Sequence, residues 1–370
     1  MKPKSVTLHP DLIRHPFSQN FKGARVSKKS PMLTDYRQGK RHLFISPKKG
    51  DIFHICASLD TRYICCSTHV ISHISNCPFE CTYCFLQNYL TDTTLTVVAD
   101  TKAIMAEIKD KVAKQPWRFF RIGTWELGDS LALPPLNQMA AALVKEFALT
   151  KNCVLKLRTK SSAVEPLMDL DHQGKTVVSW TLNPPEIIAK EEIATAPLEK
   201  RLMAMEKVAR CGYPIGLHFD PMILFNGWQN AYEGLIKMVF SAVRPKDVIW
   251  ISVGSLRFNP EMKKKIENNY PSSKITAQEL VLGDDNKFRY PRPVRQDMYS
   301  LILDCLKNVG ADQCFTYLCM ERWNVWERVF GRYPVSIGHL DYLIARSVHK
   351  RFPKTCPTMP QKGKYMALSY

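Results

Sequence analysis

The sequence predicts an α/β fold, a partial (β/α)6 barrel of the TIM type, and two observations carry this prediction. From about residue 60 onward, short apolar runs alternate with amphipathic segments, and six such β/α units follow one another. Each segment between two apolar runs is long enough for a crossover that brings the next strand back parallel to the last. In such a barrel the chemistry lies on the loops at the carboxyl ends of the strands, so a site is expected there.

The individual elements follow from the periodicity of the apolar residues. Strands are expected at 63–75, 117–123, 153–159, 176–182, 215–222, 247–254 and 314–320. A helix is expected over 100–115, because Asp100 is a good N-cap and Ile104, Ile108 and Val112 share one face. Further helices are expected over 133–147, 162–170, 198–210, 228–243, 260–269 and 297–309.

Three parts of unequal charge are expected along the chain. Residues 1–60 form a basic N-terminal arm, 61–320 the barrel with a polar hairpin insertion at about 275–290, and 321–370 a basic helical extension. Of the net charge of +18, residues 1–50 and 321–370 together carry +16. Such basic blocks form either solvated surface or arms that bind nucleic-acid phosphates, and charge alone does not choose between the two.

The sequence also indicates a compartment. The first residues contain no uninterrupted apolar stretch typical of a secretory signal, and no later stretch reaches the length of a membrane span. We therefore expect a cytoplasmic protein that does not contact a membrane. In that compartment the twelve cysteines are better candidates for metal ligands or core residues than for disulfides.

Three cysteines stand out by their spacing. Cys77, Cys81 and Cys84 form a C-x₃-C-x₂-C motif directly after the first expected strand of the barrel. A structural zinc site needs four ligands and usually shows paired C-x₂-C motifs, and no second pair follows here at that spacing. Three thiolates on a four-iron cluster leave one iron open for a substrate or cofactor. A [4Fe–4S] cluster is therefore the leading interpretation, and zinc completed by a distant ligand is the alternative.

This motif in this position resembles that of the radical S-adenosylmethionine (radical SAM) superfamily. Longer stretches, at 81–90, 157–176, 179–184 and 201–221, are similar to spore photoproduct lyase and its relatives, and the resemblance covers roughly residues 60–335. It implies that SAM is the second cofactor, that the reaction proceeds by radical chemistry, and that the substrate is a thymine-derived base in DNA. The base would be flipped out of the duplex, and an electron donor such as flavodoxin or ferredoxin would reduce the cluster.

The resemblance also implies roles for single residues. Lys160 matches a lysine that pairs with the SAM carboxylate, Thr181 replaces a serine that touches SAM, and Glu126 lies where an acidic residue accepts hydrogen bonds from the SAM amino group. Asp220, at the end of the fifth strand, is expected either to bind a ribose hydroxyl or substrate or merely to cap the next turn. Tyr83 matches a tyrosine of the hydrogen relay.

Two departures concern how the radical reaction ends. The spore lyase has a second relay tyrosine where this chain has Phe85, and it takes its hydrogen donor from a cysteine on the loop after the second strand, where residues 124–130 contain none. Cys319 is the best-placed substitute donor. We therefore expect a rearrangement or modification of the base, as in a DNA hypermodification isomerase, ahead of a lesion-cleaving repair lyase. A metal-containing DNA-binding protein without catalysis and a radical SAM enzyme acting on a small molecule or a protein remain further alternatives.

Overall fold

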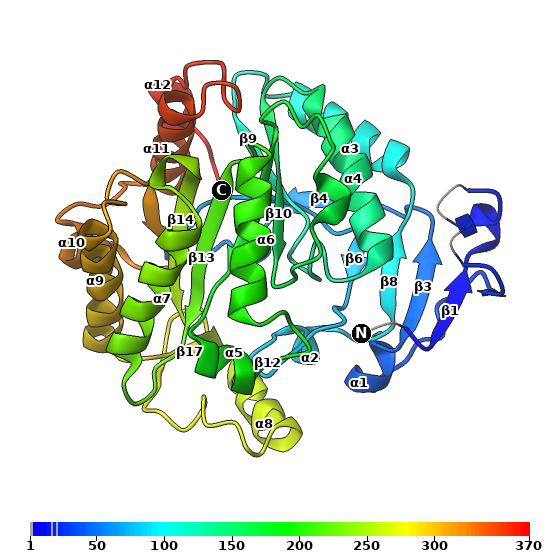
Figure 1. Ribbon diagram of the computed structural model, residues 1–370, viewed down its shortest axis with the longest axis horizontal. Helices are drawn as coiled ribbons and strands as arrows, with labels where there is room; N and C mark the ends of the chain where they lie inside the picture. The colour runs from blue at the N-terminus through cyan, green and yellow to red at the C-terminus, as the bar shows by residue number, and fades with distance from the viewer. Residues whose placement is uncertain (1–2, 16–17, 20) are drawn as a thin grey trace.

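The computed structural model describes residues 3–15, 18–19 and 21–370, and its centre is one eight-stranded sheet. The strand order is β18-β14-β13-β11-β10-β9-β5-β4, and all neighbours are parallel except β4 and β5. The strands are β4 (Phe53–Ile55), β5 (His69–Ile71), β9 (Phe120–Gly123), β10 (Cys153–Thr159), β11 (Thr176–Thr181), β13 (Ile215–Met222), β14 (Val248–Ser255) and β18 (Thr316–Leu318). The sheet curls into a half-barrel (Figure 1), which confirms the predicted fold class.

Helices cover the outer face of this sheet, as Figure 1 shows. They are α3 (Thr101–Ala113), α4 (Pro134–Ala148), α6 (Leu198–Arg210), α7 (Trp228–Ala242) and α9 (Arg292–Asn308). Strand β14 is buried along its whole length, because a parallel strand in the middle of such a sheet has protein on both faces. The helix expected over 162–170 is shorter than predicted: only a 3-10 turn, Glu165–Leu167, forms, and Pro166 disfavours helical backbone at the residue before it.

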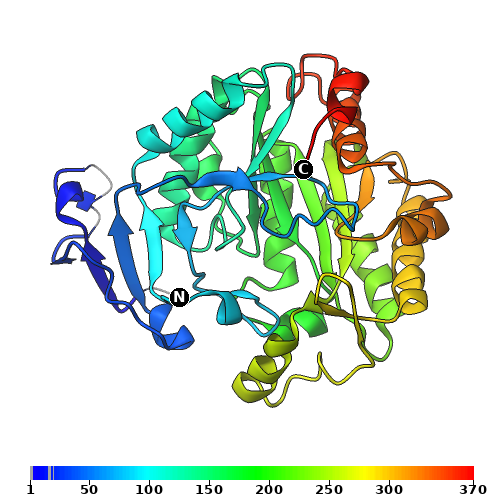
Figure 2. The same ribbon diagram turned by 180° about the vertical axis from the view of Figure 1, so that it is seen from behind.

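The N-terminal segment adds a second sheet of five strands in the order β2-β1-β3-β8-β6 (blue and cyan in Figure 2). Its strands are β1 (Ser5–Leu8), β2 (Arg25–Val26), β3 (His42–Ser46), β6 (Ile74–Ser75) and β8 (Leu95–Val98), joined by a 3-10 turn, Pro10–Leu12, and helix α1 (Tyr36–Gly39). Residues 1–2, 16–17 and 20 of the predicted arm lie outside the described residues. The sequence predicts only a basic arm for residues 1–60, and the strand expected over 63–75 forms as two shorter strands, β5 in the central sheet and β6 in this one.

Two small antiparallel sheets lie near the carboxyl ends of the barrel strands. One pairs β7 (Glu80–Cys81) with β12 (Glu192–Ile193), and the other joins β15 (Arg257–Phe258), β17 (Phe288–Arg289) and β16 (Val281–Leu282). The second sheet includes the segment where a polar hairpin is expected. Helices α2 (Leu86–Tyr89), α5 (Pro185–Glu191) and α8 (Pro260–Asn269) also lie at this end, whereas a 3-10 turn at Pro245–Asp247 directly precedes β14 at the amino ends.

The C-terminal segment packs against the barrel through α10 (Trp323–Phe330), α11 (Ile337–Arg351) and α12 (Lys362–Met366). Asp341 of α11 is buried between Arg118 at 2.8 Å and Arg121 at 2.7 Å, next to the amino end of β9. The site described below lies at the other ends of the strands. The boundaries of the three predicted parts stay a prediction. None of the helices in the described parts of the chain is long and apolar enough to cross a membrane.

Candidate active site at the carboxyl ends of the strands

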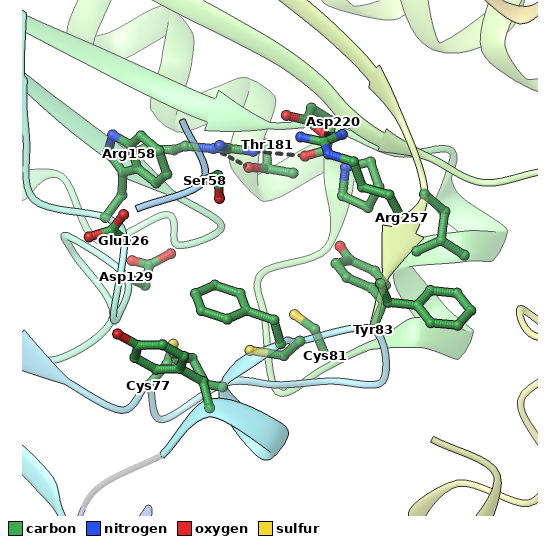
Figure 3. Close-up of a pocket in the computed structure, with 18 of the residues that line it drawn as sticks. Ser58, Cys77, Cys81, Tyr83, Glu126, Asp129, Arg158, Thr181, Asp220 and Arg257 are labelled. Atoms are coloured by element: carbon green, nitrogen blue, oxygen red, sulfur yellow. Dashed lines mark hydrogen bonds and ion pairs between the residues drawn. The ribbon is translucent and has the colours of Figure 1, made fainter. Parts of the chain in front are cut away.

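A cavity of about 500 Å³ opens at the carboxyl ends of the barrel strands. All nine residues singled out from the sequence line it: Cys77, Cys81, Tyr83, Cys84, Glu126, Lys160, Thr181, Asp220 and Cys319. In Figure 3, Cys77 and Cys81 lie on one side of the space, and Arg158, Thr181, Asp220 and Arg257 lie on the other. The structure therefore brings these residues together, while their individual roles stay predictions.

The segment from residue 76 to 84, here called the cysteine loop, is held mainly through its backbone. Asn76 adopts a positive φ of 70°, a conformation that asparagine tolerates better than most residues, and its side chain accepts a hydrogen bond from the backbone N–H of Cys77 at 2.7 Å. The loop of residues 124–130 packs closely on it: a Cβ at Gly128 would lie 2.8 Å from the carbonyl oxygen of Asn76. Glycine at 128 is what permits this approach.

Lys40 also supports the cysteine loop, a role that the sequence does not predict. Its side chain is only 2% exposed, and its ammonium donates to the carbonyl oxygens of Cys77 and Phe79, both at 2.7 Å, and to Asn76 Oδ1 at 3.4 Å. It also lies 3.9 Å from the ring centre of Tyr36. In the sequence, Lys40 is only one of the basic residues of the predicted N-terminal arm, since no local pattern distinguishes a buried lysine from its exposed neighbours.

The three thiols fit a cluster better than a single ion. Among the described residues, no three His, Cys, Asp or Glu side chains converge on one metal ion. In an iron–sulfur cluster each thiolate binds its own iron, so the sulfurs need only surround a common volume. Cys77, Cys81 and Cys84 do so from one short loop that borders the cavity. Burial raises the pKa of Cys77 and raises that of Cys81 to about 12, so in the metal-free protein both hold their protons until iron displaces them.

Arg158 and Arg257 organise the opposite side, and the sequence reasoning missed both. Arg158 donates from Nε to Thr181 Oγ1 at 2.9 Å and from Nη2 to the Asp220 carbonyl oxygen at 2.7 Å. Arg257 lies 3.2 Å from the Asp220 carboxylate and donates to Cys319 Sγ at 3.2 Å. Burial works against ionisation of Asp220, but the charges of Arg257 and Arg158 outweigh it, and the pKa of Asp220 is lowered.

Cys319 follows β18 and borders the cavity with its thiol protonated. Its backbone N–H donates to the Val253 carbonyl oxygen at 2.8 Å, which fixes it beside β14. Burial is the main cause that raises the pKa of the Cys319 thiol, and the negative charge of Asp220 raises it further. At neutral pH it therefore retains the S–H hydrogen that a donor to a carbon radical needs.

Tyr83 and Lys160 meet next to a buried carboxylate. The Tyr83 hydroxyl donates to Glu192, which also binds Arg201 at 2.6 Å and Asn183 at 2.9 Å. The Lys160 ammonium lies 5.5 Å from the Tyr83 ring centre, and within the described chain it makes no hydrogen bond to another side chain. Burial acts to lower the pKa of Lys160, but the thiolate of Cys81, where it is ionised, and the charge of Glu192 outweigh burial, and the pKa is raised. Lys160 therefore presents a cation to the cavity.

The loop of residues 124–130 contributes two carboxylates, both already engaged. Glu126 accepts from the backbone N–H of Ala57 at 2.7 Å and is paired with His54 at 2.9 Å, one contact to each oxygen. Asp129 accepts from the Thr159 hydroxyl and from the backbone N–H of Lys160, both at 2.7 Å. Asp129 Oδ1 also accepts from the backbone N–H of Leu131 at 2.9 Å, so its free capacity lies on Oδ2, whereas each oxygen of Glu126 can accept a second hydrogen bond.

A curled parallel sheet with a three-cysteine loop at its carboxyl edge defines the class of radical SAM proteins. A family model described as spore photoproduct lyase matches residues 22–294. The chain is 27% identical over 262 residues to the spore photoproduct lyase of Bacillus subtilis (strain 168), covering 70% of this chain and 72% of that one. It is 22% identical over 258 residues to that of Clostridium acetobutylicum, covering 68% and 72%. The chain therefore belongs to the spore photoproduct lyase family.

Solved structures agree with this assignment at the level of the fold. A spore photoproduct lyase complexed with dinucleoside spore photoproduct matches with a TM-score of 0.75 at 20% identity, covering 85% of this chain and 98% of that one. A variant of a spore photoproduct lyase with bound AdoMet and the same ligand gives 0.74. The chain is thus a radical SAM enzyme of this family, and the cofactors expected from the sequence, a [4Fe–4S] cluster and SAM, are those that the family uses.

Proposed function

We propose that this enzyme performs radical chemistry on a thymine-derived base in DNA. The observation that carries the proposal is the cavity, which gathers the three cysteines and the ends of β10, β11 and β13 around about 500 Å³. A relative of the same fold has been solved with dinucleoside spore photoproduct, and the family resemblance implies a thymine-derived substrate. A base would have to leave the duplex to reach this cavity, which costs a few kcal/mol.

The residues around the cavity would divide the cofactors between them. Cys77, Cys81 and Cys84 would each bind one iron, and the fourth iron would face the cavity. The free cation of Lys160 suits the carboxylate of SAM, and the remaining lone pairs of Glu126 suit its amino group. Thr181 is held by Arg158 and would position SAM from the end of β11. When bound and reduced, the cluster and SAM supply a 5′-deoxyadenosyl radical that removes a hydrogen atom from the substrate.

The finer proposal is an isomerase or modifying enzyme, in which the abstracted hydrogen returns to the product from 5′-deoxyadenosine. The loop of residues 124–130 offers no thiol, Phe85 has no hydroxyl, and the Tyr83 hydroxyl is bound to Glu192. The hydrogen relay that the resemblance implies therefore lacks both its cysteine donor and its second tyrosine. The hydroxyl of its remaining tyrosine, Tyr83, is engaged with Glu192. A product radical that is not quenched by the protein can take hydrogen back and so allow many turnovers for each SAM.

A repair lyase is the second candidate, and the position of Cys319 favours it. This thiol borders the cavity, carries its proton and lies within 3.2 Å of Arg257. It would give its S–H hydrogen to the product radical in place of the absent loop cysteine. The two candidates therefore differ in one measurable property, the origin of the hydrogen in the product.

Substrate deuterated at the abstracted position, used in ordinary water, separates the candidates. Return of deuterium to the product with many turnovers per SAM is expected for the isomerase. Product hydrogen that comes from solvent and is lost in Cys319→Ala would instead establish the lyase. Cys211→Ala is the matched control, because Cys211 is exposed and lies outside the cavity lining. Comparing DNA nucleosides by mass spectrometry before and after reaction identifies the base.

DNA binding itself has a separate test in the exposed lysines of the N-terminal segment. Replacing Lys22, Lys28 and Lys29 with Gln should reduce the slope of log affinity against log salt by up to about 2.7, since each phosphate contact contributes about 0.9. Replacement of Lys102 and Lys109 of α3 and of Lys114 at its C-cap, all exposed, removes the same charge and is the control. An equal change in both triple variants would contradict a specific role for the N-terminal segment. Reduction by flavodoxin or ferredoxin stays part of the proposal.

A further inference from the structure

The buried ammonium of Lys40 belongs to the N-terminal segment but bonds to the cysteine loop. It lies 37 residues before Cys77 in the chain, yet it donates to the carbonyl oxygens of Cys77 and Phe79 at 2.7 Å each. Its other contacts are Asn76 Oδ1 and the ring of Tyr36. Within the described part of the chain, no carboxylate lies within ion-pair distance of it, so its charge is compensated only by dipoles and an aromatic face.

Bonding to backbone carbonyls alone does not make Lys40 special. Lys175 is also buried, at 6% exposure, and donates to the carbonyl oxygens of Lys151 at 2.9 Å and Thr355 at 3.1 Å. Lys40 differs in the location of its acceptors. One is the carbonyl oxygen of Cys77, a proposed cluster ligand, and the other is that of Phe79, midway between Cys77 and Cys81. The positive charge is thus placed at the base of the loop that carries the three thiolates.

We propose that Lys40 is a positioning residue that both anchors the cysteine loop and stabilises the reduced state of the cluster through its charge. The inference rests on the proposed binding of the cluster at Cys77, Cys81 and Cys84, and it does not depend on the DNA substrate. Reduction adds one negative charge to a group already bound by three anionic thiolates. A fixed cation bonded to the backbone of a ligand residue, in a buried setting of low dielectric, would favour that added charge.

Three substitutions separate the charge from the hydrogen bonds. Lys40→Arg keeps the charge, Lys40→Gln keeps a donor but loses the charge, and Lys40→Met loses both. The readout is an anaerobic redox titration of the reconstituted protein, followed by the EPR signal of the reduced cluster, without SAM or DNA. A failed isomerase or lyase assay therefore leaves this measurement unaffected, and the two proposals can fail separately.

We expect the reduction potential of the cluster to depend on the charge of the side chain at position 40. At a fixed solution potential, Lys40→Gln and Lys40→Met should lower the ratio of reduced to oxidised cluster about tenfold, which is 59 mV for a one-electron couple. The ratio in Lys40→Arg should stay within about twofold of that in the unaltered protein. Lys175→Met is the matched control, because it removes a buried lysine with similar bonding elsewhere in the fold and should leave the potential unchanged.

A second readout concerns the anchoring of the loop. In the metal-free protein, hydrogen exchange of the backbone amides in the cysteine loop should be about tenfold faster in Lys40→Met, because the loop loses its bonds to the ammonium, and unchanged in Lys175→Met. The proposal is overturned if all Lys40 variants titrate within twofold of the unaltered protein, or if Lys40→Arg falls as far as Lys40→Met. Should the uncharged variants take up no cluster, normal loading and potential in Lys40→Arg would support it, and loss of loading in Lys40→Arg would overturn it.

Discussion

The two sides of the cavity are built in different ways. The cysteine-loop side, residues 76–84 with Lys160, is held largely by bonds to its backbone, which come from the ammonium of Lys40 and from the pairing of β7 with β12. The strand-end side, formed by Asp220, Arg257 and Cys319, is held by side-chain charges. The two departures from the family pattern, Phe85 and the thiol-free loop of residues 124–130, adjoin the cysteine loop, whereas Cys319, the proposed substitute donor, lies on the strand-end side. A loss on one side of the cavity can therefore be offset by a side chain that is held in a different way on the other.

The most severe way to break this comparison is to remove the cysteine-loop chemistry altogether. Simultaneous replacement of Cys77, Cys81 and Cys84 by Ala should abolish the absorbance near ~400 nm of the reconstituted protein and all formation of 5′-deoxyadenosine, because no iron ligand remains on the loop. The measurement is anaerobic reconstitution followed by chromatography of the SAM products. SAM cleavage by this variant would show that the cluster is bound elsewhere.

A smaller effect is expected from Lys160, which lies on the same side. Lys160→Met should weaken SAM binding by roughly 10- to 100-fold, because a hydrogen bond to a charged group contributes about 1.5–3 kcal/mol. Equilibrium binding of SAM to the reconstituted protein checks this. The spectrum of the cluster should be retained, and its loss would mean that Lys160 supports the loop instead of SAM.

The strand-end side can be probed through the acidity of its thiol. Asp220→Asn removes a negative charge that raises the pKa of Cys319 and leaves the positive charge of Arg257 beside it, so the pKa should fall. At pH 8 a larger fraction is then thiolate, and alkylation of Cys319 should be several-fold faster by mass spectrometry. Arg257→Gln should have the opposite effect. Cys211 in the same samples serves as the internal control, and an unchanged Cys319 rate in both variants would contradict this description of the side.

The smallest effect concerns the support beneath the cavity, where Glu107 of α3 binds the chain leading into β4. Burial works against its ionisation, but hydrogen bonds from Lys111, Lys48 and the N–H groups of Phe53 and Ile52 outweigh it and lower its pKa to about 2. This stabilisation is present above the unfolded pKa, near 4.5, and is lost as the pH falls toward 2. Glu107→Gln should therefore lower the free energy of unfolding by about 2 kcal/mol at pH 7 and by much less at pH 3.

Denaturant titrations at the two pH values measure this difference. If the two proteins differ as much at pH 3 as at pH 7, the contribution of Glu107 is packing and not charge. Because Glu107 does not line the cavity, SAM cleavage by the folded Glu107→Gln variant should be unchanged.

The barrel could be predicted from the sequence because its strands are long, apolar and regularly spaced. β10 and β13 have the bounds expected from 153–159 and 215–222, and α6 those expected from 198–210. The strands at the start of the chain escaped, since the short apolar stretches of β1 and β3 lie among basic residues, and the strand expected over 63–75 is divided between β5 of the central sheet and β6 of the N-terminal sheet. The cysteines were found by spacing. Lys40, Arg158 and Arg257 were not, because a buried cation acquires its role only from partners far away in the chain.

The pairing of β7 with β12 has a consequence for how the enzyme is made in the cell. Cys81 lies opposite Glu192, and Thr82 and Tyr83 bond to Glu191 and Glu192, more than a hundred residues later in the chain. While the ribosome is still extending the barrel, the loop has been synthesised but its partner strand has not. Domains generally fold as units once their segments have emerged. We therefore expect the iron–sulfur cluster to be inserted late, largely after translation, when the protein that delivers it binds a nearly complete barrel.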